Sequence, residues 1–291
     1  MSAVVSGGSD RVRFLSRRSF IELSARARAR IVLDAGSFRE LLGPFDRIKS
    51  PWLPRQGIVA QADDGVVVAR GTLEARPAVV VAIEGAYQGG SIGEVSGGKI
   101  AAALELACRD CQRGRPVLPV LLLETGGVRL QEANLGLAAI AEIHAAIVAL
   151  QRYVPVVGVV AGMVGCFGGM ALAAALLDTL IVTRQARVAM NGPEVIEQEA
   201  GISELDASDR PLIQAIMGGQ QRQATGFADV LVEDDADAIA AAVRAAFARG
   251  QGQPRRCADV DRYIHRLARI DPEHPPDPGS LPREWTRGDD P

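Results

Sequence analysis

Short runs of β-branched and aliphatic residues alternate along this chain with longer segments of helix-forming composition. Strand-like runs are predicted at 66–73, 78–83, 117–123, 156–160 and 179–183. The first two runs are joined by Glu74-Ala75-Arg76-Pro77, which predicts a hairpin. Three helical segments separate the later runs. The first ends at about Cys111, and the other two cover 135–152 and 170–177. This alternation predicts an α/β fold with a largely parallel sheet.

Two glycine-rich turns each follow a strand-like run. The first is Glu124-Thr125-Gly126-Gly127-Val128-Arg129, and the second is Gly165-Cys166-Phe167-Gly168-Gly169. Glycine allows a backbone N–H to approach a ligand closely in conformations that other residues resist. Two such turns, each opening a helix, can direct N–H donors at one oxygen that becomes negative during a reaction. A single Gly-Gly after a strand is usually only a tight turn, so the prediction of an oxyanion hole depends on the pair.

Side chains suited to catalysis are few. The three histidines are His144, in an alanine-rich helical segment, and His265 and His274, near the C-terminus. No Ser-His-Asp order, H-E-x-x-H motif or carboxylate-rich metal cluster occurs. The chemistry therefore has to depend on backbone donors, which suits an enolate formed from a thioester.

Two further motifs invite other functions. Glycines before Lys99 resemble a phosphate cradle, but neither G-x-x-x-x-G-K-[ST] nor G-x-G-x-x-G is matched, and Ile100 follows the lysine. The interpretation remains open that this turn, at the N-terminus of a helix, holds an anionic thioester carrier. Cys108 and Cys111 form a C-x-x-C, but without a second pair they are predicted to be ordinary helix cysteines.

Composition excludes several classes of protein. The chain has 291 residues, of which 48% are hydrophobic, so it can bury a large core. Its formal net charge of −3 argues against nucleic-acid binding. No run has the length of a membrane span, and the first residues lack the pattern of an export signal, so we expect that the protein is not exported. Four scattered cysteines suit the cytoplasm, where we expect the protein to be located.

The predicted organisation is an N-terminal arm at 1–18, a main domain at 19–270 and a proline-rich tail at 271–291 that we expect to be extended or disordered. A helical segment from Ser19 is predicted to break at Asp34–Ser37 and to resume over Phe38–Leu42. Arginines cluster near the start of the chain. They indicate either a solvated amphipathic helix or a surface for a partner.

The ordered motifs resemble the acyl-CoA carboxyltransferase branch of the crotonase superfamily. The resemblance rests on Gly89–Ile100, Thr125–Glu132, Gly168-Gly169 and Gly192–Glu197, together with the helical segment Ala27–Leu41. It covers about Ile21 to Val232 and is specific as an ordered set. It implies a crotonase-like ββα superhelix.

Within that branch the chain is most similar to the β subunits of biotin-independent malonate decarboxylases. The acetyl-CoA carboxylase β subunits that it also resembles carry a four-cysteine zinc ribbon, and no cysteine precedes Cys108 here. The resemblance implies that a malonyl thioester is decarboxylated to the acetyl thioester and CO2 without a metal or a directly bound cofactor. The substrate would be carried on the phosphopantetheine-type arm of an acyl carrier protein. The implied partners are a homologous γ subunit, the acyl carrier protein and an acyl carrier protein transferase subunit.

Two alternatives remain open at this point. The first is the carboxyltransferase β subunit of a biotin-dependent acyl-CoA carboxylase or decarboxylase, which would share the fold and both loops. The second is a non-catalytic subunit that only binds its partner.

The resemblance also assigns site residues. Backbone donors are implied at Gly127, Val128, Gly168 and Gly169. Substrate contacts are implied at Gly89, Gly90, Gly126, Arg129 and Phe167.

Three details of this assignment stay open. Phe167 stands where the family often has Thr. The bulkier apolar side chain of Phe167 would either exclude a biotin ring or shelter a departing carboxylate. Arg129 and Glu132 either place a carboxylate or form an ion pair at a helix start. Tyr87, Glu132 and water are the candidates for the proton donor.

Overall fold

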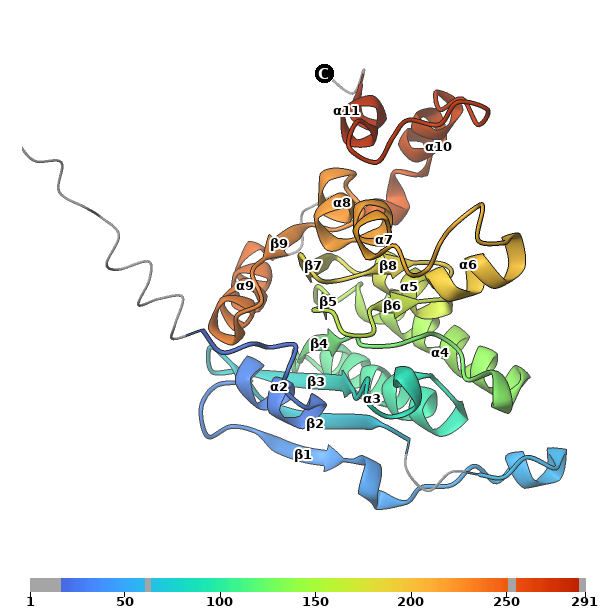
Figure 1. Ribbon diagram of the computed structural model, residues 1–291. Helices are drawn as coiled ribbons and strands as arrows, with labels where there is room; N and C mark the ends of the chain where they lie inside the picture. The colour runs from blue at the N-terminus through green and yellow to red at the C-terminus, as the bar shows by residue number, and fades with distance from the viewer. Residues whose placement is uncertain (1–16, 61–63, 251–254, 288–291) are drawn as a thin grey trace, which may run out of the picture.

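The computed structural model describes residues 17–60, 64–250 and 255–287, and Figure 1 shows their arrangement. The arm predicted at 1–18 lies almost entirely outside these residues. A seven-stranded sheet, with strand order β1-β2-β3-β4-β5-β7-β9, forms the centre of the molecule. A second sheet pairs β6 with β8. The strands are β1 (Arg39–Leu42), β2 (Val66–Leu73), β3 (Arg76–Ile83), β4 (Leu118–Leu122), β5 (Val157–Val160), β6 (Cys166–Phe167), β7 (Thr179–Thr183), β8 (Val188–Ala189) and β9 (Val230–Val232).

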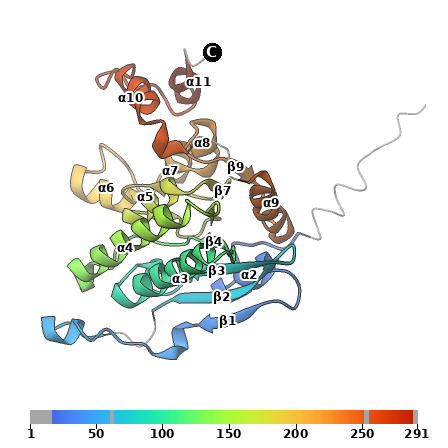
Figure 2. The same cartoon turned by 180° about the vertical axis from the view of Figure 1, so that it is seen from behind.

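Helices cover both faces of the sheet. α3 and α4 pack against each other, and α3 contacts β2, β3 and β4, whereas α2 packs with α9 and also contacts β2 and β3 (Figures 1 and 2). The helices are α2 (Ala25–Val32), α3 (Glu94–Gln112), α4 (Asn134–Leu150), α5 (Gly169–Leu176), α6 (Pro193–Ala200), α7 (Arg210–Met217), α8 (Gly219–Ala224), α9 (Ala236–Arg249), α10 (Val260–Ala268) and α11 (Leu281–Thr286). Short 3-10 turns lie at Pro44–Asp46, Leu53–Gln56, Gln88–Gly90, Leu130–Glu132 and Arg256–Ala258. The expected α/β architecture is confirmed.

The predicted hairpin forms with a tighter turn than its sequence indicates. β2 and β3 pair antiparallel until Leu73 meets Arg76, so only Glu74 and Ala75 turn the chain, with φ of 51° and 63°. Asp34 accepts hydrogen bonds from the N–H groups of both turn residues, at 3.1 and 3.0 Å, and from the Thr72 hydroxyl at 2.7 Å. These bonds hold two non-glycine residues in a left-handed conformation that ordinarily favours glycine.

The prediction that the N-terminal helix resumes over Phe38–Leu42 is wrong. Residues 39–42 form β1, the edge strand, in which Arg39 pairs with Arg70 of β2. A short segment gains more from the unpaired backbone edge of β2 than from one further helical turn, so tertiary pairing overrides local composition.

The parallel strands read as continuous apolar runs because they are buried on both faces. β4, β5 and β7 contain only buried residues, as parallel sheets covered by helices require. Their carboxyl ends carry the loops of interest. The bridges Ile92–Val128 and Thr125–Cys166 tie these loops to one another beside the β6–β8 pair.

The C-terminal region differs from the expected extended tail. Its described part includes α11, whose Trp285 is buried. The Trp285 indole N–H donates to the Thr225 carbonyl at 2.9 Å, and its ring lies 5.7 Å from that of Phe227 and 6.4 Å from that of Tyr263. Proline content alone predicted extension, and the aromatic contacts oppose it. In the part of the chain that the structure describes, no helix is both long and apolar enough to cross a membrane.

Candidate active site

The two glycine-rich turns meet backbone to backbone. Gly127 has a φ of +106° and Gly168 a φ of +61°, both in the region that favours glycine. A Cβ built on Gly127 would lie 3.1 Å from the Phe167 carbonyl oxygen, and one on Gly168 would lie 3.4 Å from the Gly127 Cα. The predicted proximity of the two turns is therefore present in the fold.

The backbone N–H groups of the two turns differ in whether they are already used. Gly126 donates to the Gly89 carbonyl at 2.8 Å, and Gly168 donates to the Met190 carbonyl at 2.9 Å. Gly127 donates to the Thr125 hydroxyl at 3.0 Å.

The N–H groups of Val128 and Gly169 are among those of these turns that have no acceptor within residues 17–60, 64–250 and 255–287. A Cβ on Gly168 would lie 3.9 Å from the Val128 nitrogen, so one donor borders the other turn. Gly169 is the first residue of α5, where N–H groups lack partners inside the helix and the helix dipole favours negative charge.

A cavity of about 470 Å³ opens beside Val128. Its polar lining includes Gln88, Ser91 and Gln131, and its apolar lining includes Ile58, Val59 and Leu130. Val59 and Leu130 are each 81% exposed in the single chain.

Gly89 and Gly90 hold the first glycine turn in place. The Gly89 carbonyl accepts from Gly126, and a Cβ on Gly90 would overlap the Glu124 carbonyl oxygen. The backbone needs glycine at 90 for this close approach. The structure thus gives Gly89, Gly90 and Gly126 a role in loop packing, and their contact with substrate stays a prediction.

Arg129 and Glu132 form a buried ion pair. Their side chains meet at 2.8 Å, Arg129 also donates to the Ser91 carbonyl at 2.9 Å, and Glu132 accepts from the Glu94 N–H at 2.7 Å. Of the two roles left open, the internal ion pair is the one that the contacts support. The Glu132 carboxylate is occupied, which weakens it as a proton donor. Tyr87 is half-buried, with the Arg129 guanidinium 5.6 Å from its ring.

Phe167 packs into a second, smaller core. Leu205, Ile213 and Met217 are the other buried members, and the Arg187 guanidinium lies 5.9 Å from the Phe167 ring. The ring therefore supports α7. Its predicted contact with substrate or biotin has no support from this packing.

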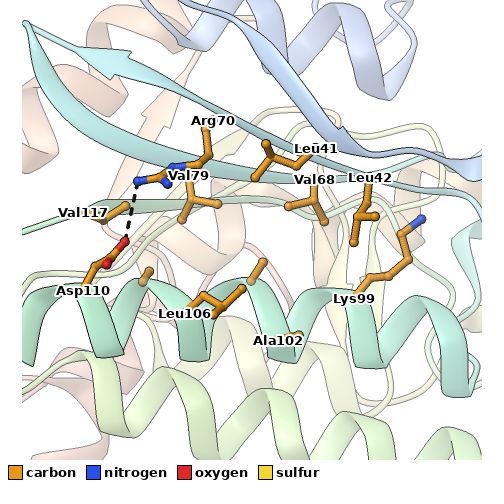
Figure 3. Close-up of a pocket in the computed structure, with 12 residues that line it drawn as sticks. Leu41, Leu42, Val68, Arg70, Val79, Lys99, Ala102, Leu106, Asp110 and Val117 are labelled. Carbon is orange, nitrogen blue, oxygen red and sulfur yellow. Dashed lines mark ion pairs between the residues drawn. The ribbon is translucent and has the colours of Figure 1, made fainter. Parts of the chain in front are cut away.

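Lys99 is a structural residue. Its ammonium group contacts both Asp64 carboxylate oxygens, at 2.9 and 2.8 Å, and the carbonyls of Gly43 and Val66. Figure 3 shows it at one end of an apolar cavity of about 130 Å³ between α3 and β1–β3, and the Arg70–Asp110 ion pair spans the other end. A phosphate would have to displace a buried carboxylate, so the phosphate-cradle interpretation fails.

The predicted helix cysteines lie on α3, where Cys108 and Cys111 are buried and unpaired. Within the described residues, no group of three or more His, Cys, Asp or Glu side chains could hold a metal ion.

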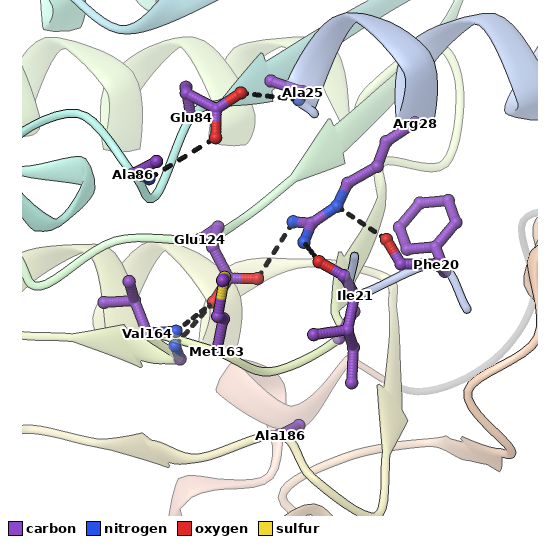
Figure 4. Close-up of polar contacts among 12 residues, drawn as sticks. Phe20, Ile21, Ala25, Arg28, Glu84, Ala86, Glu124, Met163, Val164 and Ala186 are labelled. Atoms are coloured by element: carbon purple, nitrogen blue, oxygen red, sulfur yellow. Dashed lines mark hydrogen bonds and ion pairs between the residues drawn. The ribbon is translucent and has the colours of Figure 1, made fainter. Parts of the chain in front are cut away.

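Two contacts near the loops lacked a signal in the sequence. His144 of α4 lies with Nε2 2.8 Å from the Gly169 carbonyl oxygen. Glu124 and Arg28 form a buried ion pair at 2.9 Å, shown in Figure 4. Their sequence separations of 25 and 96 residues hide both contacts from local patterns.

The fold and the paired loops define a crotonase-like carboxyltransferase-type subunit. The carboxyl transferase domain family matches residues 22–280, and the chain belongs to this family. It is 43% identical over 230 residues to the malonyl-S-ACP:biotin-protein carboxyltransferase of Malonomonas rubra, covering 76% of this chain and 72% of that protein.

Two solved structures are still more similar in sequence. A chain of a Pseudomonas malonate decarboxylase hetero-tetramer in complex with malonate is 61% identical, with a TM-score of 0.89 over 94% of this chain and 100% of that chain. A chain of a Pseudomonas malonate decarboxylase hetero-dimer is 57% identical, with a TM-score of 0.74 over 86% and 97%. The resemblance drawn from the ordered motifs and the crotonase-like fold are confirmed.

Proposed function

We propose that this chain is the β subunit of a malonate decarboxylase, and that it converts a malonyl thioester on an acyl carrier protein to the acetyl thioester and CO2. The observation that carries the chemistry is the pair of N–H groups, of Val128 and Gly169, without acceptors in the described chain. The similarity to malonate decarboxylase chains at 61% and 57% identity supports the choice of reaction.

Loss of CO2 leaves an electron pair on the α-carbon that delocalises onto the thioester oxygen, and a proton then adds to that carbon to give the acetyl thioester. Two fixed N–H donors stabilise that oxygen more in the transition state than in the substrate, because the negative charge develops there. Removing one such donor typically costs about 2.7–4 kcal/mol in the barrier. The cavity beside Val128 is the place for the carrier arm, and its Ser91 and Gln88 side chains supply polar contacts.

The site is proposed to be completed by a homologous γ subunit, with the acyl carrier protein and its transferase subunit as further partners. Apolar side chains around the loops support a partner, because Leu130, Val59, Met163 and Met190 are between 55% and 81% exposed in the single chain. The arm supplies the only prosthetic group, and it belongs to the carrier protein. We place the reaction in the cytoplasm, in keeping with four unpaired cysteines.

A second function is favoured by one observation, the 43% identity to a malonyl-S-ACP:biotin-protein carboxyltransferase. Such an enzyme would pass the carboxyl group to biotin on a carrier protein. Both functions share the enolate and the two N–H donors.

The test uses malonyl carrier protein labelled at its free carboxylate and the complex of this chain with its homologous partner. Decarboxylation releases the label as CO2, leaves acetyl carrier protein, and continues in the presence of avidin. Transfer to a biotin protein makes turnover depend on that acceptor and stop with avidin, which would overturn the proposal in favour of the second function. The chain alone should have little activity, and full activity alone would refute the shared site.

A further inference from the structure

Arg28 and Glu124 are withdrawn almost completely from water. Arg28 lies on α2 and is 5% exposed, and Glu124 follows β4 and is 1% exposed. Their side chains meet at 2.9 Å. Burying two charges is costly unless hydrogen bonds satisfy their remaining groups.

The remaining groups of this pair are bonded to backbone. Glu124 Oε1 accepts the N–H groups of Val164 and Gly165, each at 2.7 Å, and Arg28 donates to the carbonyls of Phe20 at 2.9 Å and Ile21 at 2.5 Å (Figure 4). Burial raises the pKa of Glu124, and the bonds from Gly165 and Arg28 oppose that shift. These are the contacts that stabilise the carboxylate form.

The position of Glu124 joins the two glycine turns. It directly precedes Thr125 in the first turn, and its carboxylate binds the loop that enters the second turn at Gly165. Its side chain has little freedom, because a Cβ built on Gly85 would lie 2.6 Å from the Glu124 Cγ. One side chain is therefore fixed to both loops.

We propose that Glu124, held by Arg28, is a positioning residue that sets the distance between the Val128 and Gly169 N–H donors. The inference rests on the proposed function, because it assigns this pair to the alignment of the same oxyanion site. Neither side chain touches substrate in this account.

Three variants separate positioning from general stability. Glu124→Gln keeps the shape, but its NH2 group must face either Arg28 or the two N–H donors, so a donor meets a donor in both orientations. Arg28→Met leaves a buried carboxylate without its cation. The double variant Arg28→Met/Glu124→Gln lets the amide oxygen face Val164 and Gly165, while the NH2 group turns to the vacated space. Arg26→Met is the matched control, because Arg26 lies on the same helix as Arg28 and its ion pair to Glu40 of β1 is more exposed.

The experiment measures turnover of the assembled complex, its thermal melt and the affinity for two carrier-linked analogues. One analogue bears a permanently negative oxygen at the thioester position, and the other is a thioether without that oxygen. In Glu124→Gln we expect kcat and affinity for the anionic analogue to fall together by at least about tenfold, a fraction of the effect of losing one donor. Thioether affinity and KM should change less than threefold. The double variant should recover most of the loss, and Arg26→Met should retain parental values.

The other outcomes would refute the positioning role of Glu124 or the oxyanion site on which it depends. If both analogues weaken equally, or if the double variant is no better than Glu124→Gln, the pair only ties the N-terminal segment to the core and the positioning role is wrong. Parental kcat in a folded Glu124→Gln complex would refute it also. If the parent complex itself binds the two analogues equally, the oxyanion site and the proposed function fail before the pair is tested.

Discussion

Gly127 and Gly168 lie so close that a Cβ built on Gly168 would stand 3.4 Å from the Gly127 Cα, although 41 positions separate them in the sequence. The strands of the seven-stranded sheet that lead to them, β4 and β5, are parallel neighbours. Parallel neighbours deliver their carboxyl ends to one edge of the sheet, so the turns that follow must meet there. The close backbone contact places the open N–H of Val128 beside the turn that carries the open N–H of Gly169.

We expect Gly127→Val and Gly169→Val each to lower turnover of the assembled complex by about a hundred- to a thousand-fold, the cost of losing one oxyanion donor. A branched Cβ at φ +106° strains the first turn, and one at 169 meets Ile140 Cγ2 at 2.8 Å, so both tilt the donors. Gly36→Ala is the control, because it also has a positive φ but has nothing within 4 Å of its Cβ. Turnover within a few-fold of the parent in complexes that assemble and melt normally would place the oxyanion site elsewhere.

A compensating change sharpens this result. Gly169→Ala should lose activity by displacing α5 from Ile140, and Ile140→Ala in the same chain should restore part of it by removing the clash. Ile140→Ala alone measures the cost of the cavity. No recovery in the double variant would mean that the loss at 169 has another cause.

The Thr125 hydroxyl accepts the Gly127 N–H and fixes the first turn. We expect Thr125→Val to lower kcat about tenfold with little change in KM, because a buried N–H left without an acceptor costs about 1–3 kcal/mol and the turn relaxes to find one. Thr125→Ser keeps the hydroxyl and should remain near the parent. Steady-state kinetics of the two variant complexes test this prediction. Equal kcat values for Thr125→Val and Thr125→Ser would contradict it.

Lys99→Met should destabilise the chain by about 3–5 kcal/mol, because it leaves the buried Asp64 carboxylate without its cation. The double variant Lys99→Met/Asp64→Asn should melt closer to the parent, since it also removes the buried carboxylate charge and keeps an acceptor for the Val66 N–H. Thermal or urea unfolding measures both. Addition of a nucleoside triphosphate should leave the parent melt unchanged, and protection by it would revive a phosphate role for Lys99.

Asp34 supplies a pH-dependent contribution to stability. The Thr72 hydroxyl first, and then the Ala75 N–H, hold its pKa below the ordinary 3.8. A depressed carboxyl pKa contributes stability that is present above 3.8 and is lost as the pH falls below that value through the folded-state pKa. We expect Asp34→Asn to be less stable at neutral pH and to lose less stability on acidification below pH 3.8. Asp261→Asn, at an exposed position, is the control. The measurement is the free energy of unfolding as a function of pH, and the same loss of stability below pH 3.8 in the parent and in Asp34→Asn would contradict the assignment.

The sequence determined the order of the main strands and helices between β2 and β7 and the residues that could build an oxyanion hole. Glycine at 127 and 168 follows from local backbone geometry, and the apolar runs of β4, β5 and β7 follow from burial on both faces. Such signals are local, so they can be read from the chain. Local composition misled where it opposed a distant contact, as in β1, which pairs with β2, and in α11, whose Trp285 packs on Phe227.

Only the tertiary structure decided which N–H groups are open, what Lys99 and Phe167 contact, and that Arg28 reaches Glu124. Each of these depends on an acceptor or a partner far away in the chain: Met190 for Gly168, Asp64 for Lys99, and α2 for the end of β4. A sequence pattern fixes which backbone conformations and buried faces are favourable. It does not fix which distant polar group will satisfy a given donor, because that pairing is set by how the sheet and its helices bring the loops together.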